Sequence, residues 1–127
     1  MKGNNIVAEK TYAFAIRMVK CYQYLTQEQK EFTISKQLLR SGTSIGANVE
    51  EAIGGQSGKD FHAKMTIAYK EARETNYWIR ILRDTEFIDK KIAESLLADS
   101  EEILKLIGSI LKTMKSKILN YDKIPNS

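Results

Sequence analysis

Two pairs of acidic residues are the part of this sequence that could hold a metal ion. Glu71 and Glu74 stand three residues apart, as do Glu86 and Asp89. Carboxylates at this spacing lie on one side of a helix, and carboxylate oxygens are ligands of Mg²⁺ in sites that bind phosphates. The first pair lies within a strong helical pattern, whereas the second lies where that pattern breaks. We therefore expect the two pairs to lie apart, and we predict no metal and no other cofactor.

Other catalytic arrangements find little support. The acidic pairs resemble the motifs of all-α nucleotide pyrophosphatases, so a metal-dependent enzyme of that class stays as the third-ranked alternative. A di-iron bundle needs two histidines, and His62 is the only one. The loop that contains Gly58-Lys59 lacks the spacing of a phosphate loop. Cys21 has no histidine at a spacing that suggests a nucleophilic pair. The sequence predicts no catalytic residue and no enzyme.

Basic residues suggest a different function. Lys70, Arg73 and Arg80 follow at steps of three and seven, which places them close to one helix face. They could form a solvated face that pairs with acids such as Glu74, or a surface that contacts the phosphates of RNA or DNA. The residues alone favour the solvated face by about two to one. The candidate phosphate contacts are Arg40, Lys70, Arg73, Arg80, Arg83, Lys112 and Lys115.

Length and composition limit the class of protein. The chain has 127 residues, 43% of them hydrophobic and 28% charged, which is typical of one globular domain. A net charge of +4 permits an acidic partner without requiring one. No apolar run approaches the roughly 18 residues of a membrane span, and the polar N-terminus is unlike a signal peptide. We expect a cytoplasmic protein that does not enter a membrane.

The hydrophobic pattern predicts an all-α fold, an antiparallel up-down-up-down four-helix bundle. Residues 1–127 are expected to form one domain with helices at about 5–25, 33–53, 58–84 and 90–119. Ser57 or Asp60 should cap the third helix and Asp89 the fourth. Gly54-Gly55 should end the second helix, because adjacent glycines favour termination and can adopt the left-handed cap conformation. The clearest stripe belongs to the third helix and consists of Phe61, Met65, Ala68, Ala72, Thr75, Ile79 and Leu82.

The second helix carries polar and small residues on its buried side. Its stripe consists of Ile34, Leu38, Ser41, Ile45, Asn48 and Ala52. Small residues around Ser41 and Asn48, including Gly42 and Gly46, should let a neighbouring helix come close. A buried amide needs hydrogen-bond partners. We therefore expect Asn48, together with Ser44, to bond across to Glu74, Thr75 or a tyrosine of the first helix.

Two further patterns concern association. The four helices carry two apolar stripes each, which is more apolar surface than one small bundle can cover, and exposed apolar patches mark interfaces. This predicts a homo-oligomer. The fourth helix is lopsided in charge: residues 86–103 have a net charge of −4 and residues 104–127 of +4. The helix dipole accounts for part of this asymmetry.

Residues 40–52, RSGTSIGANVEEA, are similar to a motif of the 23S rRNA intervening-sequence protein family, also called four helix bundle proteins. The matching motif residues are Arg40, Ser44, Ile45, Ala47, Asn48 and Glu51, and in the third helix Lys59, Asp60, Phe61, Ile67, Ala68 and Glu74. The chain departs from the family pattern at Ala52 and at Tyr69-Lys70, where the family often has glycine and Gly-Ser. Of the matching residues, Arg40, Ser44, Asn48, Glu51 and Glu74 are expected to have a structural role.

The resemblance implies a bundle that assembles as a ring-like homopentamer, with nucleic-acid binding as the usual suggestion and no known catalytic residues. Members are encoded in inserts within ribosomal RNA genes or elsewhere in bacterial genomes, and a related group serves diversity-generating retroelements as accessory protein. This reverses the preference on the basic face. The sequence thus predicts a non-catalytic homo-oligomer that binds RNA or DNA non-specifically. The alternative is a scaffold that docks an acidic protein partner.

Overall fold

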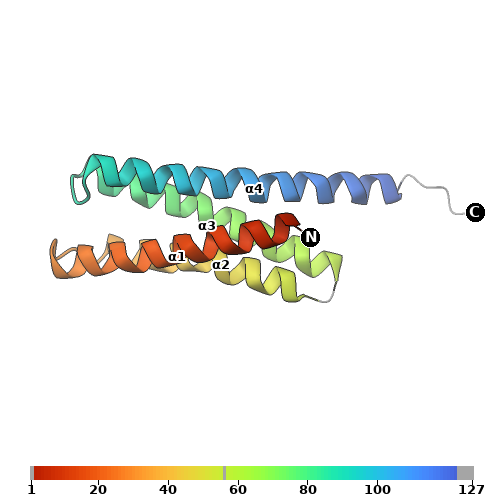
Figure 1. Cartoon of the computed structure of the whole chain (residues 1–127), viewed down its shortest axis with the longest axis horizontal. Helices are drawn as coiled ribbons and strands as arrows, with labels where there is room; N and C mark the ends of the chain where they lie inside the picture. Colours follow the sequence, from red (N-terminus) through yellow and green to blue (C-terminus); the bar gives the residue numbers. More distant parts are fainter. Residues whose placement is uncertain (1, 56, 123–127) are drawn as a thin grey trace, which may run out of the picture.

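Four long helices lie side by side along one axis in the computed structural model (Figure 1). The structure describes residues 2–55 and 57–122, and it describes side chains within residues 3–55 and 57–117. The helices are α1 (Lys2–Gln27), α2 (Ile34–Gly54), α3 (Gly58–Asp84) and α4 (Lys90–Asp122). This confirms the predicted all-α four-helix bundle. In the described part of the chain, no helix has the length and apolar character that crossing a membrane requires.

The helix bounds differ from the predicted ones only at the ends. Helix α1 begins three residues before the predicted start, so Asn4 and Asn5 lie within it, and α4 runs three residues beyond the predicted end. Each helix packs on the helix before and after it in the chain, and α1 also contacts α4. The α2–α3 contact is the most extensive and the α1–α4 contact the least. The C-terminal part of α4 extends past the other three helices (Figure 1).

The core is built from one stripe of each helix. In α1 the buried residues are Val7, Thr11, Phe14, Met18 and Leu25. The predicted stripe of α2 is buried except for Ile34, and that of α3 except for Phe61, which are both half-buried. The predicted close approach is confirmed on the α1 side of α2. A methyl group at Gly42 would overlap the Met18 side chain, and one at Gly46 would lie 3.3 Å from the Thr11 carbonyl oxygen.

Side chains in the links between helices cap the helices that follow. The Ser57 hydroxyl accepts a hydrogen bond from the Asp60 backbone N–H at 3.1 Å, and the Asp89 carboxylate accepts from the backbone of Lys91 and Ile92. Both predicted caps are confirmed. The predicted end of α2 at Gly54-Gly55 is confirmed, although Gly55 is extended, with φ −70° and ψ 157°, and not left-handed. Among the described non-glycine residues, positive φ occurs at Lys30 and Glu86. Each lies in a link at the same end of the bundle.

Candidate nucleic-acid interface

One side of α3 borders α4 and carries three of the predicted arginines. Arg73, Asn76, Arg80 and Arg83 follow at steps of three and four, so they share one side of the helix. The Asn76 side-chain amide donates to the Ser100 hydroxyl of α4 at 2.9 Å. This bond shows that this side of α3 is turned toward α4. The three arginines therefore lie along the edge where α3 meets α4.

Helix α4 adds lysines to this edge. Gly108 packs against the Tyr69 ring of α3, so this side of α4 faces α3. Lys105, Lys112 and Lys115 are spaced around Gly108 at helical steps and are all exposed. We call the surface formed by these residues the basic α3–α4 face; it comprises Lys70, Arg73, Arg80, Arg83, Lys105, Lys112 and Lys115. Lys105 was missed in the sequence, although its step from Lys112 of seven residues could have revealed it.

Most cations of this face have no acidic partner. Among the side chains that the structure describes, the ion pairs include only Arg83 of this face, whose guanidinium binds the Asp84 carboxylate at 2.8 and 3.2 Å. The hydrogen bond with Asp84 raises the pKa of Arg83, and the same bond lowers the pKa of Asp84. On the other side of α4, acidic residues form ion pairs with α1: Asp99 pairs with Arg17, and Glu102 pairs with Lys10. Glu94 of α4 also lies near Arg83 and contributes to its raised pKa. Among the described side chains, the unpaired positive charge of the face therefore belongs to its other cations, Lys70, Arg73, Arg80, Lys105, Lys112 and Lys115.

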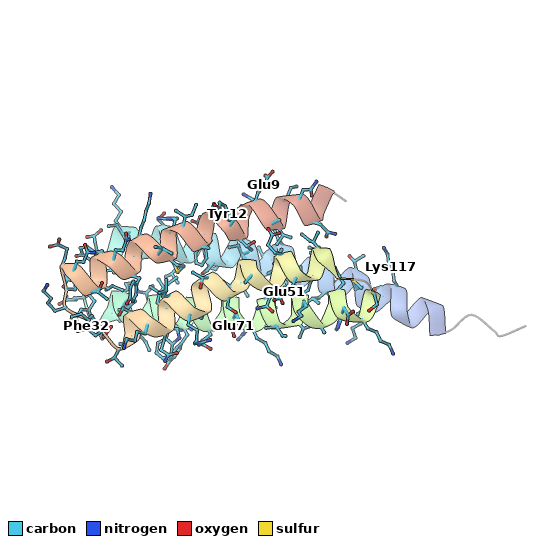
Figure 2. All side chains as sticks on the ribbon, turned by 90° about the horizontal axis from the view of Figure 1, so that it is seen from below. Glu9, Tyr12, Phe32, Glu51, Glu71 and Lys117 are labelled. Carbon is cyan, nitrogen blue, oxygen red and sulfur yellow. The ribbon has the colours of Figure 1, made fainter. Side chains whose placement is uncertain are left out.

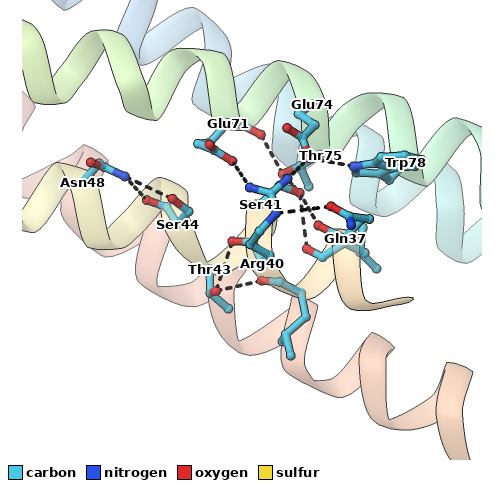
Figure 3. Close-up of polar contacts among 12 residues, drawn as sticks. Gln37, Arg40, Ser41, Thr43, Ser44, Asn48, Glu71, Glu74, Thr75 and Trp78 are labelled. Carbon is cyan, nitrogen blue, oxygen red and sulfur yellow. Dashed lines mark hydrogen bonds and ion pairs between the residues drawn. The ribbon is translucent and has the colours of Figure 1, made fainter. Parts of the chain in front are cut away.

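Arg40 lies elsewhere, at the contact of α2 with α3 (Figure 3). Its guanidinium binds Glu71, at 3.2 Å, and Glu74. The Trp78 indole N–H donates to the same Glu74 oxygen at 2.9 Å. Two carboxylates thus neutralise Arg40, which separates it from the other predicted phosphate contacts. Arg40 and Glu74 were both predicted as structural motif residues, but nothing in their spacing along the chain indicates that they bind each other.

The hydrogen bonds of the buried polar residues on α2 differ from the predicted ones. The Asn48 amide donates to the Ser44 carbonyl and hydroxyl oxygens at 2.8 and 3.1 Å, within its own helix, so the predicted bond across to α3 or α1 is wrong. The bond between helices instead joins the hydroxyls of Ser41 and Thr75 at 2.9 Å (Figure 3). One turn of helix separates Asn48 from its acceptor, which lets the amide be satisfied locally. Glu51, the remaining motif residue, pairs with Lys64 of α3 at 3.6 Å.

The two acidic pairs lie far apart. Glu71 and Glu74 bind Arg40, whereas Glu86 lies in the α3–α4 link and Asp89 caps α4. Glu71 is 13 residues before the end of α3, about 20 Å along the axis. In the described part of the chain, no group of three or more acidic, histidine or cysteine side chains is placed to hold a metal ion.

A mostly apolar groove lies between α1 and α4. It has a volume of about 360 Å³ and is lined by Arg17, Lys20, Cys21, Tyr24, Ile88, Asp89, Ile92 and Leu96. Burial raises the pKa of the Cys21 thiol to about 11, although Arg17 partly opposes this shift. The thiol is therefore protonated at neutral pH and is a poor nucleophile.

The fold and surface define a small four-helix-bundle protein with a basic edge. The chain belongs to the 23S rRNA-intervening sequence protein family, whose model matches residues 3–109. A similar solved structure is that of a protein with unknown function from the S23 ribosomal protein family of Bacteroides thetaiotaomicron. It is 53% identical, and the match covers 87% of this chain and 98% of that one with a TM-score of 0.85. No curated protein matches the chain.

Proposed function

We propose that this protein is a non-catalytic bundle that binds nucleic acid through phosphates, without reading sequence, at the basic α3–α4 face. The supporting observation is the set of exposed cations on two adjacent helices that lack acidic partners, while two acids of α4, Asp99 and Glu102, pair with α1. Exposed lysines and arginines gain affinity for nucleic acids by releasing counterions from phosphates. Arg40 is left out of this surface because Glu71 and Glu74 neutralise it.

The proposal includes assembly into a homo-oligomer in the cytoplasm. Tyr12, Ile16 and Val19 follow at helical steps on α1 and are 67%, 42% and 40% exposed, on the side away from the core. Such a contiguous apolar surface favours contact between chains. Five copies are inferred from the family resemblance alone. An assembly would repeat the basic face, so each chain needs to supply only one or two phosphate contacts.

Binding can be tested by titrating the protein with unrelated RNA and DNA oligonucleotides at several salt concentrations. We expect similar affinity for unrelated sequences and a log–log salt slope of several units. Replacing Arg73 and Lys112 by Gln removes two cations of the face. If each contacts one phosphate, the slope for duplex DNA should fall by about 1.8.

The matched control replaces Lys20 and Lys36 by Gln. Both lysines are exposed on α1 and α2, away from the basic α3–α4 face, and the loss of net charge is the same. An equal fall in slope for both double variants would show that net charge, rather than this face, governs binding. No binding by the unaltered protein near 50 mM salt would reject the proposal. It would favour a scaffold whose basic face docks an acidic protein partner.

A further inference from the structure

Tyr77 is an exposed aromatic residue in the middle of basic residues. It lies on α3 four residues after Arg73, three before Arg80 and seven after Lys70, so all four side chains lie close together on one helix surface. Its side chain is 48% exposed. Burial of the ring within the bundle therefore does not explain its presence there.

The Tyr77 ring is held from two directions. The Arg80 guanidinium carbon lies 5.8 Å from the ring centroid, within the range of a cation–π contact. The Trp78 ring meets it edge-to-face, with centroids 5.0 Å apart and an interplanar angle of 67°. These contacts limit the motion of an exposed side chain, so a flat partner would bind a ring that is already oriented.

Both contacts are anchored in the bundle. The Arg80 Nε donates to the Asn76 side-chain oxygen at 3.0 Å, and Asn76 in turn donates to the buried Ser100 of α4. The Trp78 indole donates to Glu74, which is bound by Arg40 of α2. The ring is thus connected by side-chain bonds to α4 on one side and to α2 on the other.

We propose that the nucleic acid bound at the basic α3–α4 face is single-stranded and that Tyr77 stacks on one of its bases. This inference rests on the proposed function and specifies its ligand. A ring between cations matches the chemistry of single-strand binding, in which basic residues contact the backbone and aromatic residues stack on bases regardless of sequence. Bases inside a duplex are stacked on each other and offer no face to a ring on a helix surface.

The test measures the affinity of three probes of equal length at one salt concentration: a single strand, a duplex, and a single strand whose nucleotides lack bases. We expect the base-containing strand to bind more tightly than the abasic one. Tyr77→Leu should weaken binding of the base-containing strand about tenfold and leave the other two unchanged. Tyr77→Phe keeps the ring and should retain affinity. Tyr24→Leu, which removes an exposed tyrosine from α1, is the matched control.

Trp78 provides a second readout, since it is the only tryptophan of the chain and touches Tyr77. Its fluorescence should change when the base-containing strand binds, and the change should be lost in Tyr77→Leu. Circular dichroism of each variant confirms that the helices are intact.

The possible outcomes separate this inference from the proposed function. Equal affinity of Tyr77→Leu and the unaltered protein for the single strand overturns the stacking inference, while phosphate binding by Arg73 and Lys112 still stands. Preference for the duplex, or equal binding of base-containing and abasic strands, also overturns it. Failure of every probe to bind rejects the proposed function, and the ligand inference fails with it.

Discussion

The Glu31 side chain shows how a single residue starts a helix. Its carboxylate accepts hydrogen bonds from the backbone N–H groups of Thr33, Ile34 and Ser35, the shortest being 2.7 Å to Ser35. The first N–H groups of a helix have no partner within it, so these bonds stabilise the start of α2. Thr33, at the usual capping position, makes no such bond with its side chain. Thr33 has a residue type that is common at caps, but the preceding link gives this role to the Glu31 carboxylate.

We predict that Glu31→Gln lowers the free energy of unfolding by about 1 kcal/mol at neutral pH, as loss of a helix cap does. Burial raises the pKa of Glu31, but the hydrogen bonds from Ser35, Ile34 and Thr33 lower it more, so the net shift is downward. The carboxylate therefore stabilises the fold fully above the unfolded pKa of about 4.3, and this contribution is lost as pH falls through the lower folded value.

Urea unfolding at pH 7 and pH 3 measures both effects. The difference between Glu31→Gln and the unaltered protein should shrink at pH 3. Glu28→Gln is the control, because Glu28 is an exposed acid of the same link, and it should change stability little at either pH. A difference for Glu31→Gln that stays constant with pH would contradict the role of the ionised carboxylate.

At the scale of helices, the sequence predicts most of the buried apolar residues. It predicts few of the hydrogen bonds and ion pairs between helices. The apolar stripe of α3 gives its orientation directly, because seven positions at steps of three and four leave one face for the core. The partner of a polar side chain depends on how two helices are rotated and shifted relative to each other. Residue spacing within one helix does not reveal this relative position. The Ser41–Thr75 bond and the Arg40–Glu74 pair both depend on that register, and so does the position of Tyr77 beside Arg80.

Gly42 tests the close contact of α1 with α2. A methyl group there would overlap the Met18 side chain and lie 3.0 Å even from its Cβ. Alanine improves helix propensity by about 1 kcal/mol, but overpacking a core costs about 1–3 kcal/mol. We predict that Gly42→Ala lowers the free energy of unfolding by about 1 kcal/mol in urea unfolding. Gly54→Ala, at a glycine with no neighbouring atom within 4 Å of the added carbon, should not be destabilising. If Gly42→Ala were instead more stable, α1 or its Met18 side chain would have to shift at little cost in free energy.

At the scale of the whole molecule, two exposed surfaces take no part in packing the core. One is the apolar stripe of α1, where Tyr12 lies on the outside of the bundle (Figure 2), and the other is the basic α3–α4 face. In the described part of the chain, the α1 backbone comes close to α2 and α4 but not to α3, which is its diagonal neighbour. An assembly in which α1 meets a surface of the next chain other than α3 would leave the outer side of α3 free to bind nucleic acid.

We predict that light scattering at micromolar concentration returns about five times the chain mass of 14.5 kDa. Ring closure with five copies requires a heterologous contact, in which the α1 stripe meets a different surface of the next chain. Replacing Ile16 and Val19 by Gln removes apolar area without changing charge, so the mass should fall. Ile53→Gln changes an equally exposed apolar residue at the end of α2 and should keep the assembly.

The same double variant connects assembly with nucleic-acid binding. Sites linked in one assembly raise the effective concentration of each other for a long strand. The dissociated Ile16→Gln, Val19→Gln variant should therefore bind long oligonucleotides more weakly, yet bind a short one, which reaches a single chain, as the unaltered protein does. A monomer mass for the unaltered protein would reject assembly through α1. An assembled protein whose double variant keeps the same mass would place the contact on another surface.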